Sequence, residues 1–326
     1  MKILSIFSFS MLSFFPTLYP DELLYSTLAR YHIRSGNKSF KQTDLELFGY
    51  SSQQICKITL TNNLNYLVKN LPLRSQQKVE NLLQNHTLYP FYATLLMPQE
   101  AWLLKNSMSK KFSGSILDFA KVANNSSDDS KKFLKFCPEC LEKDTQKYGE
   151  PYWHRIHQVP GILVCPIHRV VLHNSCIEVE SKGIHYHAAS IDNCLLANNV
   201  KKLTNKTVET LSTLAHDINW LIHSSFAFQG LAWLRAQYQR YLLDKGLLKT
   251  FAGGKFKFDD YGFAQLIYEF YGQESLEAIN PRLAQHQGKY FSHCLFGCDV
   301  NPAIDRITHI LMIKFLANSI EEFFQS

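Results

Sequence analysis

Apolar positions near the start of the chain recur at helical spacing. Leu24, Leu28 and Tyr31 lie three and four residues apart, and Gly36 follows them closely. Glycine is a common residue just past a helix end because it adopts left-handed backbone angles easily. The acidic residues at 21–22 precede the run, where we expect them to favour the helix dipole from the first turn. The pattern therefore predicts a helix that begins near residue 20 and ends at Gly36.

Further stretches show the same periodicity, and glycine, proline or polar turns bound most of them. They lie at residues 43–48, 60–71, 211–221, 231–245, 259–271 and 301–311. Helices of this kind at both ends of the chain predict a mainly α protein. The N-terminal group is helix-turn-helix-like in its short helices and turns, and a plain helical bundle remains an equally open alternative.

Composition suggests four parts along the chain. The polar run at 124–130 is the best linker candidate, and the cysteine-rich stretch follows it. We therefore predict an N-terminal extension, a helical domain, a zinc-finger module with short strands and a C-terminal helical domain, at residues 1–10, 11–130, 131–200 and 201–326. The first residues are charged and then apolar but precede no cleavage site, so Met11 is an alternative start. No stretch is apolar for long enough to span a membrane.

The most specific motif is a pair of short Cys/His knuckles. Cys137 and Cys140 are separated by two residues in Cys-Pro-Glu-Cys, and after 24 intervening residues Cys165 and His168 repeat the spacing in Cys-Pro-Ile-His. Four soft ligands at such spacing can close a tetrahedral zinc site that leaves no position for water. The pattern predicts structural zinc, reduced thiols and a cytoplasmic location. Two unrelated cysteine pairs in a core are the alternative.

A second group of ligand types follows the second knuckle. Cys176, His185, His187 and Cys194 could hold another zinc ion, but they are separated by eight, one and six residues. Because that spacing is irregular, buried thiols and free polar histidines remain the alternative to a second site.

Between the knuckles lies a stretch that mixes aromatic and basic residues. Tyr152 and Trp153 could stack on nucleic acid, or they could cover a zinc site too small for a core of its own. We predict that DNA phosphates are contacted by four basic residues, of which three precede the first knuckle and one lies between the knuckles: Lys131, Lys132, Lys135 and Arg155. A solvated basic face is the alternative, since the formal charge of the 326-residue chain is only +6.

The chain lacks the common catalytic motifs. No glycine-rich phosphate loop and no Gly-x-Ser-x-Gly turn occur in it. The acidic pairs Asp128-Asp129 and Asp259-Asp260 lie at turns or helix starts, where solvated or capping carboxylates are expected. We therefore expect a binding protein, not an enzyme, and keep a zinc-stabilised nuclease or other hydrolase as a third hypothesis.

Taken together, the motifs resemble the TnsD/TniQ family of transposon target-selection proteins. The resemblance is carried by residues 14–30, 86–92, 137–168 and 301–316, of which the zinc block is the most specific. It implies a non-enzymatic adaptor in DNA transposition that recruits a TnsC-type AAA+ ATPase. In the short members, the adaptor docks on a guide-RNA Cascade complex and leaves target reading to base pairing.

The resemblance also leaves alternatives open. Because the sequence stops at Ser326, we expect the short, CRISPR-associated branch. The alternative is a TnsD-type protein that binds a specific attachment-site DNA directly and recruits the same ATPase. Either protein would act on the nucleoid in the cytoplasm, and a homodimer stays open.

Overall fold

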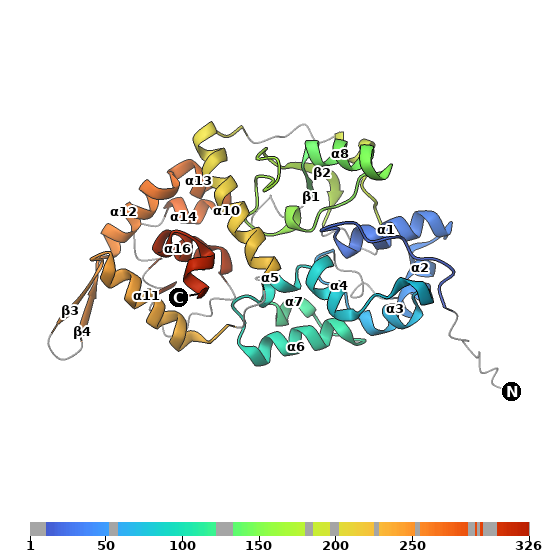
Figure 1. Ribbon diagram of the computed structural model, residues 1–326, viewed down its shortest axis with the longest axis horizontal. Coiled ribbons are helices and arrows are strands. Elements are labelled where there is room, and N and C mark those ends of the chain that lie inside the picture. Colours follow the sequence, from blue (N-terminus) through green and yellow to red (C-terminus); the bar gives the residue numbers. More distant parts are fainter. Residues whose placement is uncertain are drawn as a thin grey trace.

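The fold is mainly helical, as the sequence predicts. The computed structural model describes most of the chain, namely residues 11–51, 58–121, 133–179, 185–195, 202–224, 228–251, 255–285, 291, 294–295 and 305–325. Our expectations for residues 1–10, for Lys131 and Lys132 and for the 124–130 linker fall outside these ranges. Figure 1 shows the N-terminal helices at one end of an elongated molecule, the C-terminal helices at the other and the strands β1 and β2 between them.

The N-terminal part is built from short helices around a leucine-rich core. Its elements are α1 (Leu24–Ser35), α2 (Phe40–Phe48), α3 (Leu64–Asn70), η1 (Leu73–Ser75), α4 (Val79–His86), α5 (Tyr89–Ala93), α6 (Pro98–Ser109) and α7 (Ile116–Phe119). As predicted, α1 and α2 end at glycines: Gly36 and Gly49 both adopt left-handed backbone angles, with φ of 69° and 74°. The predicted helix over 60–71 is shorter than expected, because only α3 forms there.

The central part combines a two-stranded sheet with short helices. Its elements are β1 (Phe133–Phe136), α8 (Pro138–Tyr148), η3 (Ile156–Gln158), β2 (His173–Glu178) and α9 (Ile191–Leu195). The strands are antiparallel, with Phe136 opposite His173 and Lys135 opposite Asn174. Because β1 leads directly into α8, the sheet fixes the start of that helix.

The C-terminal part packs its helices around the apolar helix α16. Its elements are α10 (Asn205–His223), α11 (Leu231–Asp244), β3 (Leu248–Phe251), β4 (Lys255–Phe258), α12 (Asp260–Tyr271), α13 (Gln273–Ile279), α14 (Pro281–Gln285), α16 (Arg306–Ala317) and α17 (Ile320–Gln325). All residues of α16 except Ile307 are buried, so this helix forms the centre of the C-terminal core. None of the helices that the structure describes has the length and hydropathy needed to cross a membrane.

Two helix starts differ from the sequence prediction. The first helix begins at Leu24, so Asp21 and Glu22 lie before its first turn and not within it. Their carboxylates accept hydrogen bonds from buried arginines instead. For the last predicted helix, residues 301–304 fall outside the described ranges; α16 begins at Arg306, and Asp305 accepts a hydrogen bond from the Thr308 amide.

His309 lies at the centre of the C-terminal core. Its Nδ1 is 2.8 Å from the Tyr238 hydroxyl, and the two rings stack with centroids 6.0 Å apart. Burial lowers the pKa of His309 from about 6.5 to about 4, although Asp305 acts in the opposite direction. The folded protein therefore holds this imidazole neutral over a range where the unfolded chain would protonate it.

We predict that His309 makes the protein less stable as the pH falls from 6.5 to 4. Because the unfolded state binds the proton first, the free energy of unfolding should drop by roughly 3 kcal/mol from this group across that window. Denaturant titrations of wild type and His309→Gln at several pH values would measure how much of the pH dependence of the free energy of unfolding is due to His309. The exposed His216, replaced by glutamine, serves as control; equal pH slopes for wild type and His309→Gln would contradict the prediction.

Candidate metal centre

The four residues of the two knuckles lie together in the central part. Cys137 is the N-cap of α8 and Cys140 lies in its first turn, with Pro138 at the first helical position, which proline favours. The second knuckle is a tight turn closed by a backbone hydrogen bond from the Cys165 amide to the Val170 carbonyl, 2.9 Å long. Each pair is thus held by its own turn, and tertiary packing brings the two turns face to face.

The ligand atoms form a compact group. Nδ1 of His168 lies 3.4 Å from the sulfur of Cys137, 3.3 Å from that of Cys140 and 3.7 Å from that of Cys165. The sulfurs of Cys140 and Cys165 are 3.8 Å apart. All four atoms are within 4.8 Å of one another and could hold one metal ion.

The surroundings favour thiolate at one of the three cysteines. Hydrogen bonds among the three sulfurs, together with burial, raise the pKa of the Cys137 and Cys140 thiols. The sulfurs of Cys137 and Cys140 lie close enough to share hydrogen bonds with Cys165, and this lowers the pKa of the Cys165 thiol well below its usual range. The position of Cys137 at the N-terminus of α8 adds the positive end of the helix dipole. The Cys140 amide also lies 3.5 Å from the Cys137 sulfur, and the cysteine side chains are buried. The group therefore holds a thiolate at Cys165 in a shielded position, and a metal bound here would displace protons from the other two thiols.

Two histidines that the sequence analysis missed lie behind Cys140. Nε2 of His157 is 4.0 Å from the Cys140 sulfur, and His154, Cys140 and His157 form a second group with ligand atoms within 4.8 Å. His154 is engaged by Asp144 at 2.7 Å. Because Cys140 belongs to both groups, these two histidines lie next to one of the four proposed metal ligands. The only sequence signal for these two histidines was that they are three positions apart in the chain.

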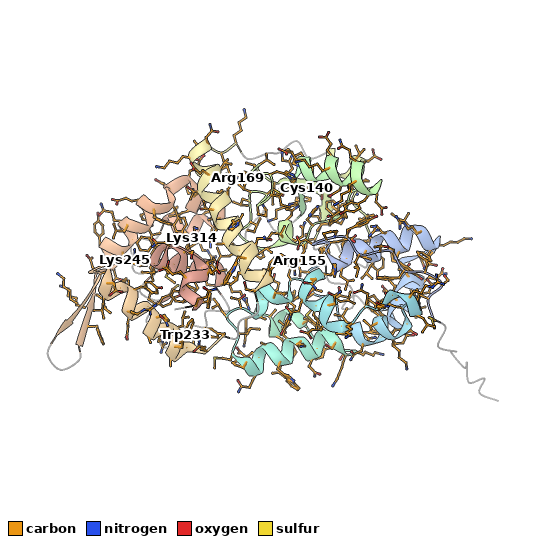
Figure 2. The ribbon with its side chains drawn as sticks, in the orientation of Figure 1. Cys140, Arg155, Arg169, Trp233, Lys245 and Lys314 are labelled. Atoms are coloured by element: carbon orange, nitrogen blue, oxygen red, sulfur yellow. The ribbon has the colours of Figure 1, made fainter. Side chains whose placement is uncertain are left out.

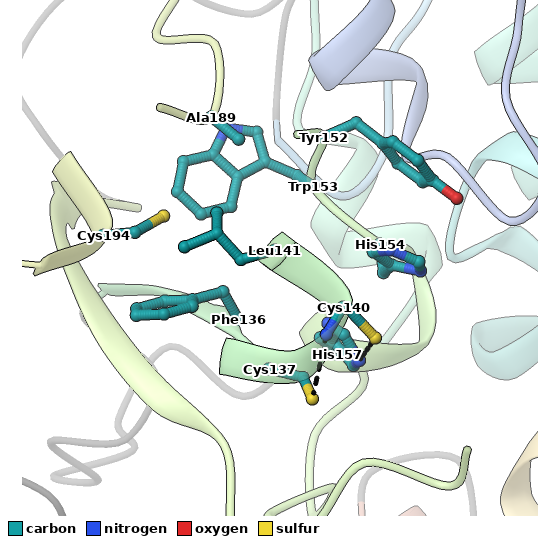
Figure 3. Close-up of a pocket in the computed structure, with 10 residues that line it drawn as sticks. All are labelled: Phe136, Cys137, Cys140, Leu141, Tyr152, Trp153, His154, His157, Ala189 and Cys194. Atoms are coloured by element: carbon teal, nitrogen blue, oxygen red, sulfur yellow. Dashed lines mark hydrogen bonds between the residues drawn. The ribbon is translucent and has the colours of Figure 1, made fainter. Parts of the chain in front are cut away.

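The aromatic residues between the knuckles belong to the interior. Trp153 is fully buried and donates from its indole nitrogen to the His187 carbonyl at 2.8 Å, while the Tyr152 hydroxyl donates to the Pro20 carbonyl at 3.0 Å. Figure 3 shows both side chains around the pocket that Cys137 and Cys140 also line. Of the two alternatives for these residues, the structure supports covering the cysteine group.

The second set predicted from sequence does not come together as a site. Cys176 is exposed and Cys194 is buried. His185 and His187 stack with ring centroids 5.7 Å apart, and Phe40 packs edge-on against both rings. Among the described residues, the two groups given above are the ones whose ligand atoms lie close enough for a metal, and neither contains these four. The prediction of a second metal from this set is therefore corrected.

Two of the predicted phosphate contacts are also corrected. Lys135 is 7% exposed, and its ammonium donates to the Ile162 carbonyl at 2.7 Å. Arg155 is fully buried. Both side chains serve internal hydrogen bonds, which the sequence could not distinguish from a basic surface.

Arg155 joins three parts of the molecule. Its Nε donates to Asp21 at 2.8 Å, one Nη donates to the Gln84 carbonyl, and the other donates to Nε2 of His223 at 2.9 Å. These partners come from the segment before α1, from α4 and from the end of α10. Asp21 also accepts from the Ile156 amide at 3.0 Å. Figure 2 shows Arg155 near the middle of the molecule, where these parts meet.

A second buried ion pair lies beside the first. Arg30 of α1 donates to Glu22 at 2.9 Å and to Glu150 at 2.7 Å, and Arg34 reaches the same Glu150 oxygen at 2.6 Å. Burial raises the pKa of Glu22, while Arg30 acts in the opposite direction. Backbone hydrogen bonds from Leu23 to Trp153 and from Arg155 to Asp21 complete the contact. The residues before and within α1 and those at 150–156 thus form one buried junction.

The comparisons with known proteins match both halves of the chain. The TniQ family model matches residues 13–172, and the model described as Tn7-like transposition protein D matches residues 214–326. The chain is 29% identical over 154 residues to the transposon Tn7 transposition protein TnsD of Escherichia coli. That alignment covers 47% of this chain and 30% of the relative, so it spans less than a third of the relative's length. The cysteine group, Arg155 and its partners Asp21 and Gln84 lie within the TniQ match, whereas its partner His223 lies within the TnsD match.

We predict that Asp21→Ala strongly destabilises the fold. The change leaves the buried Arg155 guanidinium and the Ile156 amide without their carboxylate, which should lower the free energy of unfolding by about 3 kcal/mol or more. Urea denaturation would measure it. Asp192→Ala, at an exposed position on α9, is the matched control and should stay within about 0.5 kcal/mol of wild type. A variant at position 21 as stable as that control would be evidence against the junction.

Proposed function

Because the chain belongs to the TnsD/TniQ family of transposition proteins, we propose that it is an adaptor that selects the target site for DNA transposition. In this proposal it binds a target-recognition complex and recruits a TnsC-type AAA+ ATPase, acting on the nucleoid in the cytoplasm. The observation that carries the proposal is the succession of a TniQ match and a TnsD match on one chain. The buried junction supports it further, because it couples the parts that would meet different partners.

We propose that the adaptor catalyses neither the formation nor the cleavage of covalent bonds. Asp259, one of the acidic residues considered for a nuclease, accepts a hydrogen bond from the Gly262 amide at 3.0 Å and caps α12. The cysteine group offers four protein ligands, and a filled tetrahedral shell leaves no position for an activated water. These features favour binding over catalysis.

We assign zinc to the cysteine group. Zinc with Zn–S bonds of ~2.3 Å in a tetrahedron separates two sulfurs by about 3.8 Å, and a sulfur from a nitrogen by about 3.5 Å. The Cys140–Cys165 separation of 3.8 Å and the sulfur–His168 separations of 3.3 to 3.7 Å fit these values. The role of zinc here would be to supply folding energy. Cys137, Cys140, Cys165 and His168 would hold it between α8 and the second knuckle.

We predict that Cys140→Ser loses bound zinc and destabilises the central part. Structural zinc contributes on the order of 10 kcal/mol to small sites, so the loss should appear both in metal content and in thermal stability. Elemental analysis of the purified protein together with thermal melting would measure the two effects. Cys176→Ser, at an exposed cysteine outside the group, is the control and should keep metal and stability. Full zinc content in Cys140→Ser would exclude the assignment.

The target-recognition complex is proposed to be a guide-RNA Cascade bound to DNA, in which base pairing reads the sequence. The burial of Lys135 and Arg155 removes two of the predicted phosphate contacts from the central part, which supports a route in which the chain itself contacts little DNA there. The second candidate is direct binding to a specific attachment-site DNA. The match of residues 214–326 to the TnsD model and the identity to Tn7 TnsD favour that candidate.

Affinity purification of the full chain, expressed together with its neighbouring genes, tests these proposals. We expect the AAA+ ATPase, Cascade subunits and guide RNA in the eluate, with only weak, salt-sensitive binding to random duplex. Retention of one particular duplex at physiological salt, without Cascade, would establish the second candidate. If neither the ATPase nor a target complex is retained, the adaptor proposal is wrong. Light scattering on the same sample would show whether the chain is a dimer.

A further inference from the structure

A β-hairpin stands apart from the body of the C-terminal part. Strands β3 and β4 connect α11 to α12 and project away from the helices (Figure 1). They pair antiparallel, with Leu248 opposite Phe258 and Lys249 opposite Lys257. Two-stranded hairpins are marginally stable on their own, so this one depends on contacts at its base.

The two faces of the hairpin differ in character. Leu248 is buried, and the ring of its partner Phe258 packs against Phe263 of α12 with centroids 5.4 Å apart. Successive side chains in a strand point to opposite faces, so Lys249 and Lys257 lie on the other face, and both are exposed. The apolar pair anchors the hairpin and the lysine pair faces solvent.

The lysine pair is electrostatically unfavourable in the protein alone. Residues directly opposite in an antiparallel pair have Cβ atoms roughly 5 Å apart, and like charges there are destabilising. No acidic side chain forms an ion pair with Lys249 or Lys257 in the part of the chain that the structure describes. Residues 245–258 contain four lysines and no acidic residue, while the nearest acids, Asp244 and Asp259, flank this segment. An anion bound to this face would relieve the repulsion.

We propose that the Lys249/Lys257 face of the hairpin binds the phosphate backbone of duplex DNA. A two-stranded ribbon fits the major groove, and lysines on one face of it can reach phosphates along the groove wall. The inference rests on the proposed function in taking DNA as the polyanion. It places a DNA contact in residues 214–326, which match the TnsD model, and away from the buried basic residues of the central part. An acidic protein surface is the competing partner.

Binding of the full chain to a random-sequence duplex, measured over a range of salt concentrations, tests the proposal. In Lys249→Gln/Lys257→Gln, we expect weaker binding to every duplex sequence and a log–log salt slope reduced by about 2, roughly one per lost phosphate contact. The control is Lys202→Gln/Lys206→Gln, which makes the same charge change at two exposed positions, one just before α10 and one in its first turn. The control should keep the wild-type slope, and circular dichroism should show both variants folded.

Three outcomes would overturn the proposal. One is a hairpin variant with the affinity and salt slope of the control. Another is a wild-type chain that binds no duplex even at low salt. The third is a hairpin variant that keeps DNA binding but loses the AAA+ ATPase in affinity purification, which would assign this face to an acidic protein surface. The affinity purification of the wild type tests separately whether the chain retains the ATPase and the target complex. The hairpin proposal can therefore fail while the adaptor proposal stands.

Discussion

The buried guanidinium of Arg155 is the contact on which the arrangement of the whole chain depends. It binds the segment before α1, the end of α4 and the end of α10 through Asp21, Gln84 and His223. A buried charge is tolerated only when its hydrogen bonds are met, so each of these partners is held in place by the same requirement. The position of the N-terminal helices relative to the central and C-terminal parts is therefore set by a polar group and not by apolar packing alone.

The cysteine group and this junction share one short stretch of chain. Cys140 lies in α8, the same helix ends near Glu150, and Arg155 follows a few residues later. A metal ion that holds the two knuckles would also fix the stretch from which Arg155 reaches its partners. In an adaptor, such coupling would keep binding surfaces on different parts of the chain at a constant separation, so that one partner is presented correctly to another.

The local features of the fold were accessible from sequence because they depend on neighbouring residues. Gly36 and Gly49 end their helices since glycine tolerates a positive φ, and Asp259 caps α12 through its own turn. The four knuckle residues were identified as a group from their spacing, because each pair needs only one tight turn. His154 and His157 were missed, since nothing in their spacing shows that they pack behind Cys140.

The sequence by itself determined the helical class, the glycine ends of α1 and α2 and the membership of the cysteine group, all of which follow from periodicity, turn chemistry and ligand spacing. Only the tertiary structure decided which charges are buried. Lys135 and Arg155 look like surface bases in sequence, yet both donate interior hydrogen bonds. By contrast, nothing in the sequence singled out Lys249 and Lys257, which lie opposite each other on the two strands of the hairpin. The reason is physical: burial and cross-strand pairing depend on residues far apart in the chain, and the identity of a lysine or an arginine carries no information about them.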